Sequence, residues 1–291
     1  ALQTIAEGED IVSVPQELAL NLGSEGVNPG YAAIQLVRIE RSEERRAAGW
    51  YQPFLDILPP YEECDTTDFF SPEELAALEW EEVQKETTER LALLEQTYEA
   101  SQGKASAGFS SDGQFTWEEY MWGVYQVVSR VLSIYTSEEG GTKYLIPMID
   151  LFNHDAKSPH SLKCTGGFFK VIAGKEIRVG QQIMFPYGGG NLHSDRVIQD
   201  YGFVEENNPR DVEHLLSAKS GQAVPGRPFT GKGCDLPALD ALLASFSTSL
   251  DQDQALLADK TAPLSPRMRL AVEFRAAKKR AILAAKAQLQ A

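Results

Sequence analysis

The sequence lacks a long apolar run, a cysteine framework and an excess of positive charge. Among its 291 residues no apolar stretch reaches the roughly 18 residues that a membrane-spanning helix needs, so no membrane association is expected. The N-terminus has neither the basic stretch nor the apolar run of a secretory signal. Lysine and arginine total 27 against 42 aspartates and glutamates, which leaves a net charge of −15. A field of that sign repels phosphate backbones, so no direct sequence-specific binding of nucleic acid is expected.

Cysteine and histidine are few and scattered. No pair of them has the spacing of a zinc site, and the odd number of cysteines does not indicate a disulfide framework; the residues are Cys64, Cys164, Cys234, His154, His160, His193 and His214. We therefore expect no metal site. Hydrophobic residues make up 43% and charged residues 24%, an ordinary globular composition with enough length for one large domain or two modest ones.

The first part of the chain changes from strand to helix. Residues 11–14 predict a short strand that Pro15 ends, because proline cannot donate a hydrogen bond to a ladder. From about residue 31 to residue 134 the pattern is helical. Ser71 with Glu74 predicts a capping box that opens a helix at Pro72. Residues 101–114 are rich in glycine and serine and predict a mobile connection.

A second capping box, Thr116 with Glu119, predicts another helix. Its apolar residues recur at helical spacing and form one face, consisting of Tyr120, Val124, Val127 and Val131. Beyond residue 142 the pattern changes to strands and turns. Short strands are predicted at 144–149, 168–173 and 183–187, the last of them bounded by glycines.

A polar stretch follows Pro209, and a final helix is predicted to begin near Ser265 and Pro266. Its apolar face consists of Leu270, Phe274, Ala277 and Ala281. Between residues 267 and 290 seven basic residues and one acidic residue give a net charge of +6. We expect this basic face to dock on, or to be solvated beside, the acidic remainder of the chain; a face for a binding partner is the minor alternative.

Two segments carry residues with possible chemistry. In the first, residues 146–155, an apolar strand is predicted to run into Asp150, Asn153 and His154. Such residues after a strand more often sit in a turn and satisfy backbone groups, so this segment alone is a weak signal.

The second segment, residues 180–204, gathers four aromatic side chains: Phe185, Tyr187, Tyr201 and Phe203. Their ordinary role is a core in which tyrosine hydroxyls bond to backbone groups. The functional alternative is an aromatic-walled slot with hydroxyls at its mouth, which suits a cationic or desolvated amine.

Together these segments resemble the SET domain of protein methyltransferases, in the branch of the plant Rubisco large-subunit lysine methyltransferase and the actin-histidine methyltransferase. The motifs are P-M-I-D-L-F-N-H at 147–154, G-Q-Q-I-x-F-x-Y-G at 180–188 and Y-G-F-V at 201–204. Further agreement comes from Glu7-Gly8-Glu9 with Val14-Pro15, the stretch from Trp50 to Pro59, Trp122-Gly123, Ser129-Arg130 and the last 45 or so residues. The resemblance covers most of the chain.

The resemblance implies an S-adenosylmethionine site. It places Asn153 and His154 against the cofactor, with Asp150 just before them, and brings Ser129 and Arg130 toward the methionine carboxylate. Arginine suits that role because its fork pairs with a carboxylate through two parallel bonds.

The remaining implied positions concern the reaction and its channel. Tyr187 is placed at the point of methyl transfer, and Phe203 at the cofactor wall. The substrate channel is assigned to Leu132, Phe185 and Tyr201. An aromatic channel of low dielectric would favour the neutral form of a lysine amine, and no metal is required.

The implied fold is α+β: a SET domain of short β-sheets with a helical insert and a reduced helical C-terminal module. We assign residues 1–30 to the N-terminal part of the core, and we expect its start to be truncated, because residue 1 lies past the glycine-containing cofactor segment with which the family's chain begins. Residues 31–141 are assigned to the insert, 142–208 to the C-terminal part of the core with the cofactor and channel motifs, and 209–291 to the helical module.

The expected function is S-adenosylmethionine-dependent methylation of a protein, with lysine favoured and histidine left open as the acceptor. The alternative is a catalytically weak or inactive SET-type subunit of a larger complex, such as a plastid transcription complex. A protein substrate or a protein complex is the expected partner. The chloroplast is favoured over the cytoplasm or nucleus, because plant and algal members are frequently plastid proteins.

Two departures from the family pattern lie near the predicted site. Leu132 stands where an aromatic residue often occurs, which predicts a wider or less cation-friendly slot. Between the second and third motifs, related enzymes have Ser-Asn. At residues 190–195 this chain has G-N-L-H-S-D instead, so Asn191 and Ser194 are only weak candidates for site residues.

Overall fold

A computed structural model describes residues 1–24, 26, 28–42, 51–102, 115–136, 140–216 and 234–291. The chain divides into two compact units, each made of two separate segments: unit 1 is Ala1–Glu63 with Leu94–Asn191, and unit 2 is Cys64–Leu93 with Leu192–Ala291. The predicted insert at 31–141 thus contributes residues to both units. Trp50 and residues 103–114, which the sequence analysis singled out, lie outside the described residues.

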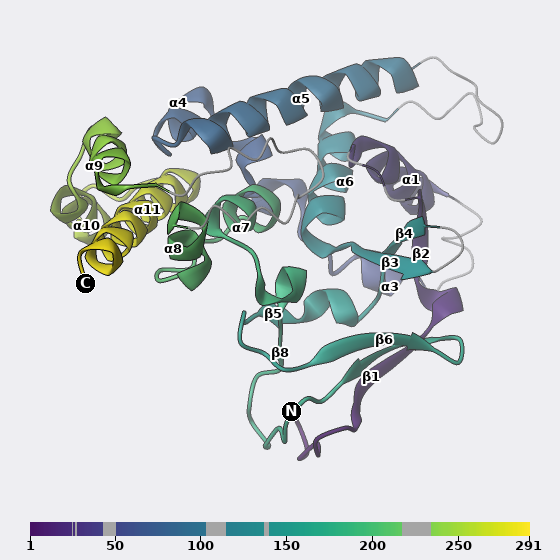
Figure 1. The fold of residues 1–291 in the computed structure, drawn as a ribbon. Helices are drawn as coiled ribbons and strands as arrows, with labels where there is room; N and C mark the ends of the chain where they lie inside the picture. Colours follow the sequence, from purple (N-terminus) through teal and green to yellow (C-terminus); the bar gives the residue numbers. More distant parts are fainter. Residues whose placement is uncertain (25, 27, 43–50, 103–114, 137–139, 217–233) are drawn as a thin grey trace. The chain divides into compact units, whose positions relative to one another are not determined.

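Unit 1 contains the strands, arranged in three small sheets (Figure 1). The first has the order β1-β7-β6 and is antiparallel, with strands Asp10–Pro15, Phe168–Ile172 and Ser161–Thr165. The second has the order β2-β4-β3, also antiparallel, with strands Leu20–Ser24, Gly140–Leu145 and Leu132–Thr136. The third is a parallel pair of two-residue strands, β5 (Asn153–His154) and β8 (Met184–Phe185). The predicted α+β class is confirmed.

Inward-facing strand residues and residues of the connecting segments together build an apolar core in unit 1. Its buried members are Val14, Ala19, Ile146, Ile149, Phe169 and Val171. Short 3-10 turns connect the strands and loops of this unit: η1 (Gln16–Leu18), η2 (Tyr61–Glu63), η4 (Ile149–Leu151) and η5 (Tyr187–Gly190).

Two long helices of unit 1 pack on each other: α1 (Gly30–Arg41) and α6 (Trp117–Arg130). Gly123 permits this approach, because a Cβ atom there would lie 3.0 Å from the carbonyl oxygen of Ala33. Helix α6 also holds the segment after the short helix α3 (Gln52–Leu55). The side chains of Trp122 and Gln126 both donate to the Pro59 carbonyl at 2.9 Å.

Both predicted capping boxes are confirmed. Thr116 accepts a hydrogen bond from the Glu119 N–H, and the Glu119 side chain accepts from the Thr116 N–H at the start of α6. Ser71 and Glu74 make the same exchange at the start of α4 (Pro72–Ala76). These reciprocal bonds satisfy donors that the first helical turn leaves without a partner.

Several predicted boundaries are wrong. The strand predicted at 144–149 ends at Leu145, and the helical stretch predicted to reach residue 134 gives way to β3 at Leu132. The strand predicted at 183–187 is only the two residues of β8, because Pro186 follows and cannot donate to a ladder. Helix α4 stops before α5 (Glu81–Ser101), with Glu79 between them at a φ of 49°.

Met148 interrupts the strand predicted at 144–149. Its φ of 71° lies in a region that side chains with a Cβ rarely adopt, and 58% of its surface is exposed. Replacing Met148 by Gly is expected to raise the free energy of unfolding by about 1 kcal/mol, because glycine adopts positive φ without a steric penalty. Chemical denaturation measures the change. Leu151→Gly, in the same turn at an ordinary φ, is the control and should lower stability; a loss of stability in both variants would contradict the strain at Met148.

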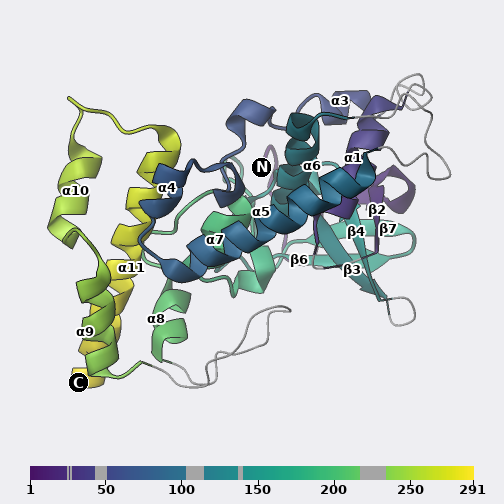
Figure 2. The same ribbon diagram turned by 90° about the horizontal axis from the view of Figure 1, so that it is seen from above.

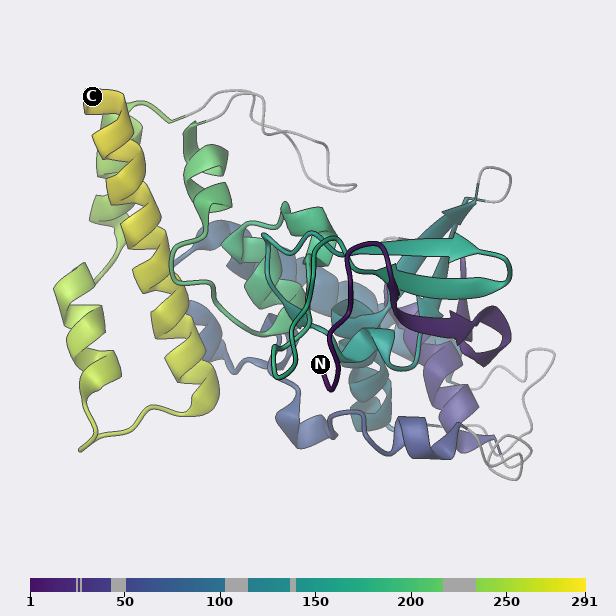
Figure 3. The ribbon, with the colours of Figure 1, turned by 90° about the horizontal axis from the view of Figure 1, so that it is seen from below.

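Unit 2 is helical. Besides α4 and η3 (Thr67–Phe69), it contains α7 (Ser194–Tyr201), α8 (Pro209–Leu216), α9 (Leu236–Ser245), α10 (Leu250–Ala258) and α11 (Pro266–Gln290). Helices α9 and α10 lie along α11, as the views in Figures 2 and 3 show. The sequence analysis predicted only a polar stretch between residue 209 and the final helix. The structure instead has helices α8, α9 and α10 in this part of the chain. The last two are short and begin at side-chain caps, Asp235 and Ser249.

The apolar core of unit 2 gathers along α11, from Ala271 to Ala285. Its largest buried members are Phe70, Leu78, Trp80, Ile198, Phe246, Phe274 and Ile282. No helix among the described residues is long and apolar enough to cross a membrane.

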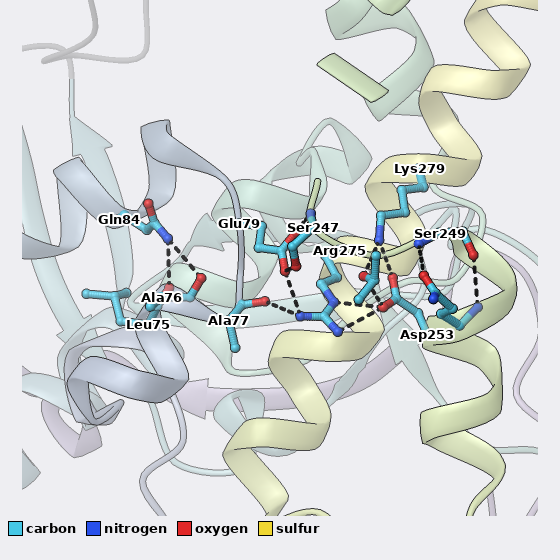
Figure 4. A network of polar contacts seen from close by, with 12 residues as sticks. Leu75, Ala76, Ala77, Glu79, Gln84, Ser247, Ser249, Asp253, Arg275 and Lys279 are labelled. Atoms are coloured by element: carbon cyan, nitrogen blue, oxygen red, sulfur yellow. Dashed lines mark hydrogen bonds and ion pairs between the residues drawn. The ribbon is translucent and has the colours of Figure 1, made fainter. Parts of the chain in front are cut away.

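The predicted docking of the basic helix face on acidic groups is confirmed for three buried cations of α11. Arg275 and Lys279 both contact Asp253 of α10, with Nη2 of the arginine at 2.8 Å and Nζ of the lysine at 2.5 Å (Figure 4). Arg275 also contacts Glu79, which in turn accepts from Ser247. The third cation, Lys278, is 1% exposed. These pairs fix α11 against α10 and the turn after α4.

Candidate active site

Tyr187 joins the two segments that the sequence analysis singled out. Its phenol donates to the carbonyl oxygen of Phe152 at 2.5 Å, and its backbone N–H donates to Nδ1 of His154 at 3.0 Å. The rings of His154 and Tyr187 lie 5.0 Å apart. The parallel pairing of β5 with β8, which sets Asn153 opposite Met184, brings these residues together. Tyr187 therefore lies beside the Asn-His pair, as the resemblance implies.

A run of glycines turns the chain directly after Tyr187. Gly188, Gly189 and Gly190 all have positive φ. At Gly190 a Cβ atom would also lie 2.3 Å from the carbonyl oxygen of Ala156. Only glycine fits there, and this close approach places the end of the second segment against the loop that follows the Asn-His pair.

Arg130 and Asp150 form an ion pair at the end of α6. Nη1 of the arginine lies 3.5 Å from a carboxylate oxygen of Asp150 and donates to the backbone carbonyl of the same residue at 3.2 Å. The Asp150 side chain is fully buried. Within the described part of the chain, neither of its carboxylate oxygens accepts a hydrogen bond of good geometry, and Nε of Arg130 donates none. Weaker contacts with Arg130 and with the backbone N–H groups of Met148 and Asp150 act to lower the pKa of the carboxyl. The pair therefore has hydrogen-bonding capacity that the described residues use only in part.

Burial also controls the ionisation of this group of residues. Burial raises the pKa of Asp150 to about 6, although the charge of Arg130 acts to lower it. Burial likewise raises the pKa of the Tyr187 phenol, with Arg130 opposing and Asp150 reinforcing the change. The phenol therefore stays protonated at neutral pH and can orient a ligand but not act as a phenolate base.

The raised pKa of Asp150 predicts a pH-dependent gain in stability when the carboxylate is removed. The folded pKa of about 6 exceeds the ordinary value of 3.8 for an aspartate. Ionisation of Asp150 therefore lowers the stability of the fold, and this loss is absent at low pH, grows as pH rises through the interval between the two values and is complete above pH 6. Asp150→Asn is therefore expected to gain up to about 3 kcal/mol relative to the wild type between pH 4 and pH 8. Denaturation at both pH values measures the difference. A gap between the two proteins that stays constant with pH would contradict the raised pKa; Asp155→Asn is the exposed-loop control.

The predicted channel residues of unit 1 lie in apolar surroundings. Leu132 and Phe185 pack on the core of this unit, and the ring of Phe185 stacks on Phe152 at 6.4 Å. Ser129 has a local partner, and its approach to the methionine carboxylate stays a prediction. Its hydroxyl donates to the Tyr125 carbonyl at 2.6 Å, within α6 itself.

Tyr201 and Phe203 belong to unit 2, where Tyr201 is the last residue of α7. Their rings lie 6.3 Å apart. Gly202 separates them at a φ of 70° and ends the helix. Their assignment to the channel and the cofactor wall stays a prediction.

Ser194 does not serve as a site residue. Its N–H and its hydroxyl both donate to Asp211, and the side chain is completely buried. Asn191 donates to the carbonyl of Gly189 at 3.3 Å, within the glycine turn. Both residues therefore have local structural partners.

The sequence analysis missed a buried polar cluster in unit 2. Ligand-type atoms of His193, Asp195 and Asp211 lie within 4.8 Å of one another, and so do those of Glu82, Asp195 and His214. The ammonium of Lys278 supplies positive charge there, at 2.5 Å from Asp195 and 3.3 Å from Asp211. No sequence spacing could reveal this cluster, because α5, α7, α8 and α11 each contribute to it.

Comparisons with known proteins find similarity to one protein, LSMT, and to a family model that is named after it. Residues 236–282 match a family model described as "Rubisco LSMT substrate-binding". Among solved structures, the SET domain of LSMT bound to lysine and AdoHcy matches with a TM-score of 0.68 at 19% identity, covering 100% of this chain and 83% of that one. Rubisco LSMT bound to AdoMet matches with a TM-score of 0.64 at 20% identity, covering 100% and 84%. The complex of Rubisco LSMT with sinefungin and monomethyllysine gives 0.66 at 18%, again covering 100% and 84%.

A search of curated proteins found no match to this sequence. The chain thus shares the fold of the SET domain of LSMT, and its C-terminal residues 236–282 are similar to the substrate-binding family of Rubisco LSMT.

Proposed function

We propose that this protein transfers a methyl group from S-adenosylmethionine to a lysine side chain of a protein substrate. The observation that carries the proposal is the buried Arg130–Asp150 pair beside Tyr187, with polar atoms that make no hydrogen bond of good geometry within the described residues. Buried polar groups in folded proteins are nearly always satisfied, so those left over indicate a ligand. LSMT, which shares the fold, has been solved with AdoMet, with AdoHcy and with lysine.

The residues present fit the methionine end of S-adenosylmethionine, which carries a carboxylate and an ammonium group. Arg130 can pair with the carboxylate, and the oxygens of Asp150 can accept from the ammonium. Asn153 and His154 would hold the cofactor from the adjoining strand. When bound, S-adenosylmethionine supplies an electrophilic methyl group on its sulfonium.

The protein's own contribution is orientation and exclusion of water. Leu132 and Phe185 provide apolar walls that disfavour an ammonium and so favour the neutral, nucleophilic amine of a substrate lysine. The Tyr187 hydroxyl, fixed by the Phe152 carbonyl, can accept a hydrogen bond from that amine. Holding the amine in line lowers the entropic part of the barrier. We assign Tyr201 to the substrate and Phe203 to the cofactor.

Two measurements test the proposal. Isothermal calorimetry with S-adenosylmethionine should show binding by the wild type and a loss of roughly tenfold or more in affinity for Arg130→Gln. Arg210→Gln is the matched control, at a half-buried arginine of unit 2 that contacts Glu213 at 2.7 Å. Transfer of labelled methyl groups to a protein extract then tests catalysis. Binding without transfer, or neither, would favour the alternative of a SET-type structural subunit.

A protein substrate is the partner that this function requires. Mass spectrometry of the labelled proteins will show whether the methyl group is on lysine or on histidine. Location in the chloroplast stays a prediction, which fluorescence microscopy of a tagged full chain can test.

A further inference from the structure

The side chain of His154 is bonded to the backbone of Tyr187. The two backbones run in neighbouring strands, because His154 pairs with Phe185 of β8 and the next N–H, that of Asp155, donates to the Phe185 carbonyl at 3.2 Å. The imidazole reaches two residues further. Its Nδ1 accepts from the Tyr187 N–H at 3.0 Å, and the two rings lie 5.0 Å apart at an angle of 38°. All of these residues belong to unit 1.

This bond fixes the tautomer of the imidazole. A nitrogen that accepts from an N–H group carries no proton, so the neutral ring of His154 has its proton on Nε2. Toward any other group, a cofactor included, the ring then acts through Nε2–H as a donor. The two nitrogens of His154 thus have separate roles, and the role of Nδ1 is the attachment of Tyr187.

The residues on either side of Tyr187 make this attachment important. Pro186 precedes it and has no N–H group to donate. Gly188 and Gly189 follow at φ values of 54° and 66°, and glycine loses more conformational freedom on folding than any other residue. The bond to His154 therefore holds the backbone between a residue that cannot donate and two residues whose ordering has the highest entropic cost.

The same short segment holds both ends of Tyr187. The backbone N–H is bonded to His154, and the phenol donates to the carbonyl of Phe152 at 2.5 Å. The two acceptors are only two positions apart in the chain. A displaced backbone at Tyr187 would shift the phenol oxygen, and a shift of about 1 Å at a reacting centre can lower a rate about 100-fold.

We propose that His154 is a positioning residue, whose unprotonated Nδ1 fixes the backbone of Tyr187 and thereby the phenol oxygen that accepts from the substrate amine. The inference rests on the proposed function for the role of Tyr187, but the attachment itself is a property of unit 1. Through Nδ1 the imidazole touches no reacting atom and acts only on the Tyr187 N–H.

Two substitutions separate this role from contact with the cofactor. His154→Asn keeps an acceptor, because its amide oxygen is bonded to Cγ as Nδ1 is, whereas His154→Leu removes the acceptor and keeps a side chain of similar bulk. Both variants lose Nε2, so KM for S-adenosylmethionine should change equally in the two. We expect kcat for methyl transfer to stay within about fivefold of wild type in His154→Asn and to fall about 10- to 100-fold in His154→Leu.

His160 supplies a matched control within unit 1. Its Nδ1 accepts from the Gly174 N–H at 3.1 Å, a bond of the same kind in which Tyr187 takes no part. His160→Leu should therefore leave kcat within about threefold of wild type.

Hydrogen exchange at the Tyr187 amide supplies the readout that does not depend on activity. This amide should exchange about 5- to 10-fold faster in His154→Leu than in wild type, His154→Asn and His160→Leu. With an active wild type, equal kcat values in His154→Asn and His154→Leu would overturn the inference, as would an unaltered exchange rate in His154→Leu. If the wild type transfers no methyl group, the proposed function fails, and the exchange rates alone decide whether His154 fixes Tyr187.

Discussion

Replacing Tyr187 by Phe is expected to lower kcat for methyl transfer by about two to three orders of magnitude with the fold retained. The phenol is the group that the two converging segments hold most tightly, through the Phe152 carbonyl and the ring of His154. Because the phenol donates to a carbonyl, its lone pairs stay available to accept from an amine. Phe keeps the ring packing and the backbone bond to His154 but removes that acceptor.

The raised pKa of Tyr187 refines this expectation. A phenol that stays protonated at neutral pH orients the amine and does not remove its proton. The loss in Tyr187→Phe should therefore be nearly constant from pH 7 to pH 9, measured as initial rates with labelled S-adenosylmethionine. Tyr31→Phe, at an exposed ring in α1, is the matched control. Equal rates for all three proteins would remove Tyr187 from the reaction.

The largest expected effect on stability concerns Lys278. Replacing it by Met should lower the free energy of unfolding by about 3–5 kcal/mol at pH 8, because it leaves the carboxylates of Asp195 and Asp211 buried without their ammonium partner. The ring of Trp80 lies 4.7 Å from the same ammonium and loses a cation–π contact as well. Denaturant titration followed by tryptophan fluorescence measures the change.

The loss should depend on pH in a defined direction. Without the ammonium, the folded pKa of a buried carboxylate lies above its unfolded value, so the penalty is complete at high pH and shrinks as pH falls. We expect a smaller difference from wild type at pH 5 than at pH 8. Lys286→Met is the control: its partner Asp240 is largely exposed, so the change should stay below about 1 kcal/mol. An equal loss of unfolding free energy in both variants would contradict the expectation that removing a buried ammonium destabilises the fold more than removing an exposed one.

Local chemistry was predictable from the sequence, and long-range pairing was not. The capping boxes at Ser71 and Thr116 are complete within four residues, so the pattern predicts them directly. The β5–β8 pair joins residues 31 positions apart, and each strand has only two residues, which is too short to show any periodicity. The burial of Lys278 was hidden for the same reason, since its partners come from α7 and α8.

The residues of the candidate site were predictable, but their physical states were not. Arg130, Asp150, His154 and Tyr187 were implied by resemblance alone, and the described structure groups them in unit 1. Their physical states could not be foreseen, because the raised pKa of Asp150 depends on burial that only the folded unit supplies. Ser194 was mistaken for a candidate because its spacing gave no indication of its bonds to Asp211.

The interleaved composition of the two units has a consequence for how the protein is synthesised. Residues 64–93 leave the ribosome early, but the helices that complete their unit follow only after residue 191. Until α11 emerges, Asp195 and Asp211 lack the ammonium of Lys278, and the core cluster around Trp80 lacks Phe274 and Ile282. The core of this unit therefore stays incomplete through most of translation, and we expect the early segment to be the part of the nascent chain that most needs protection from aggregation.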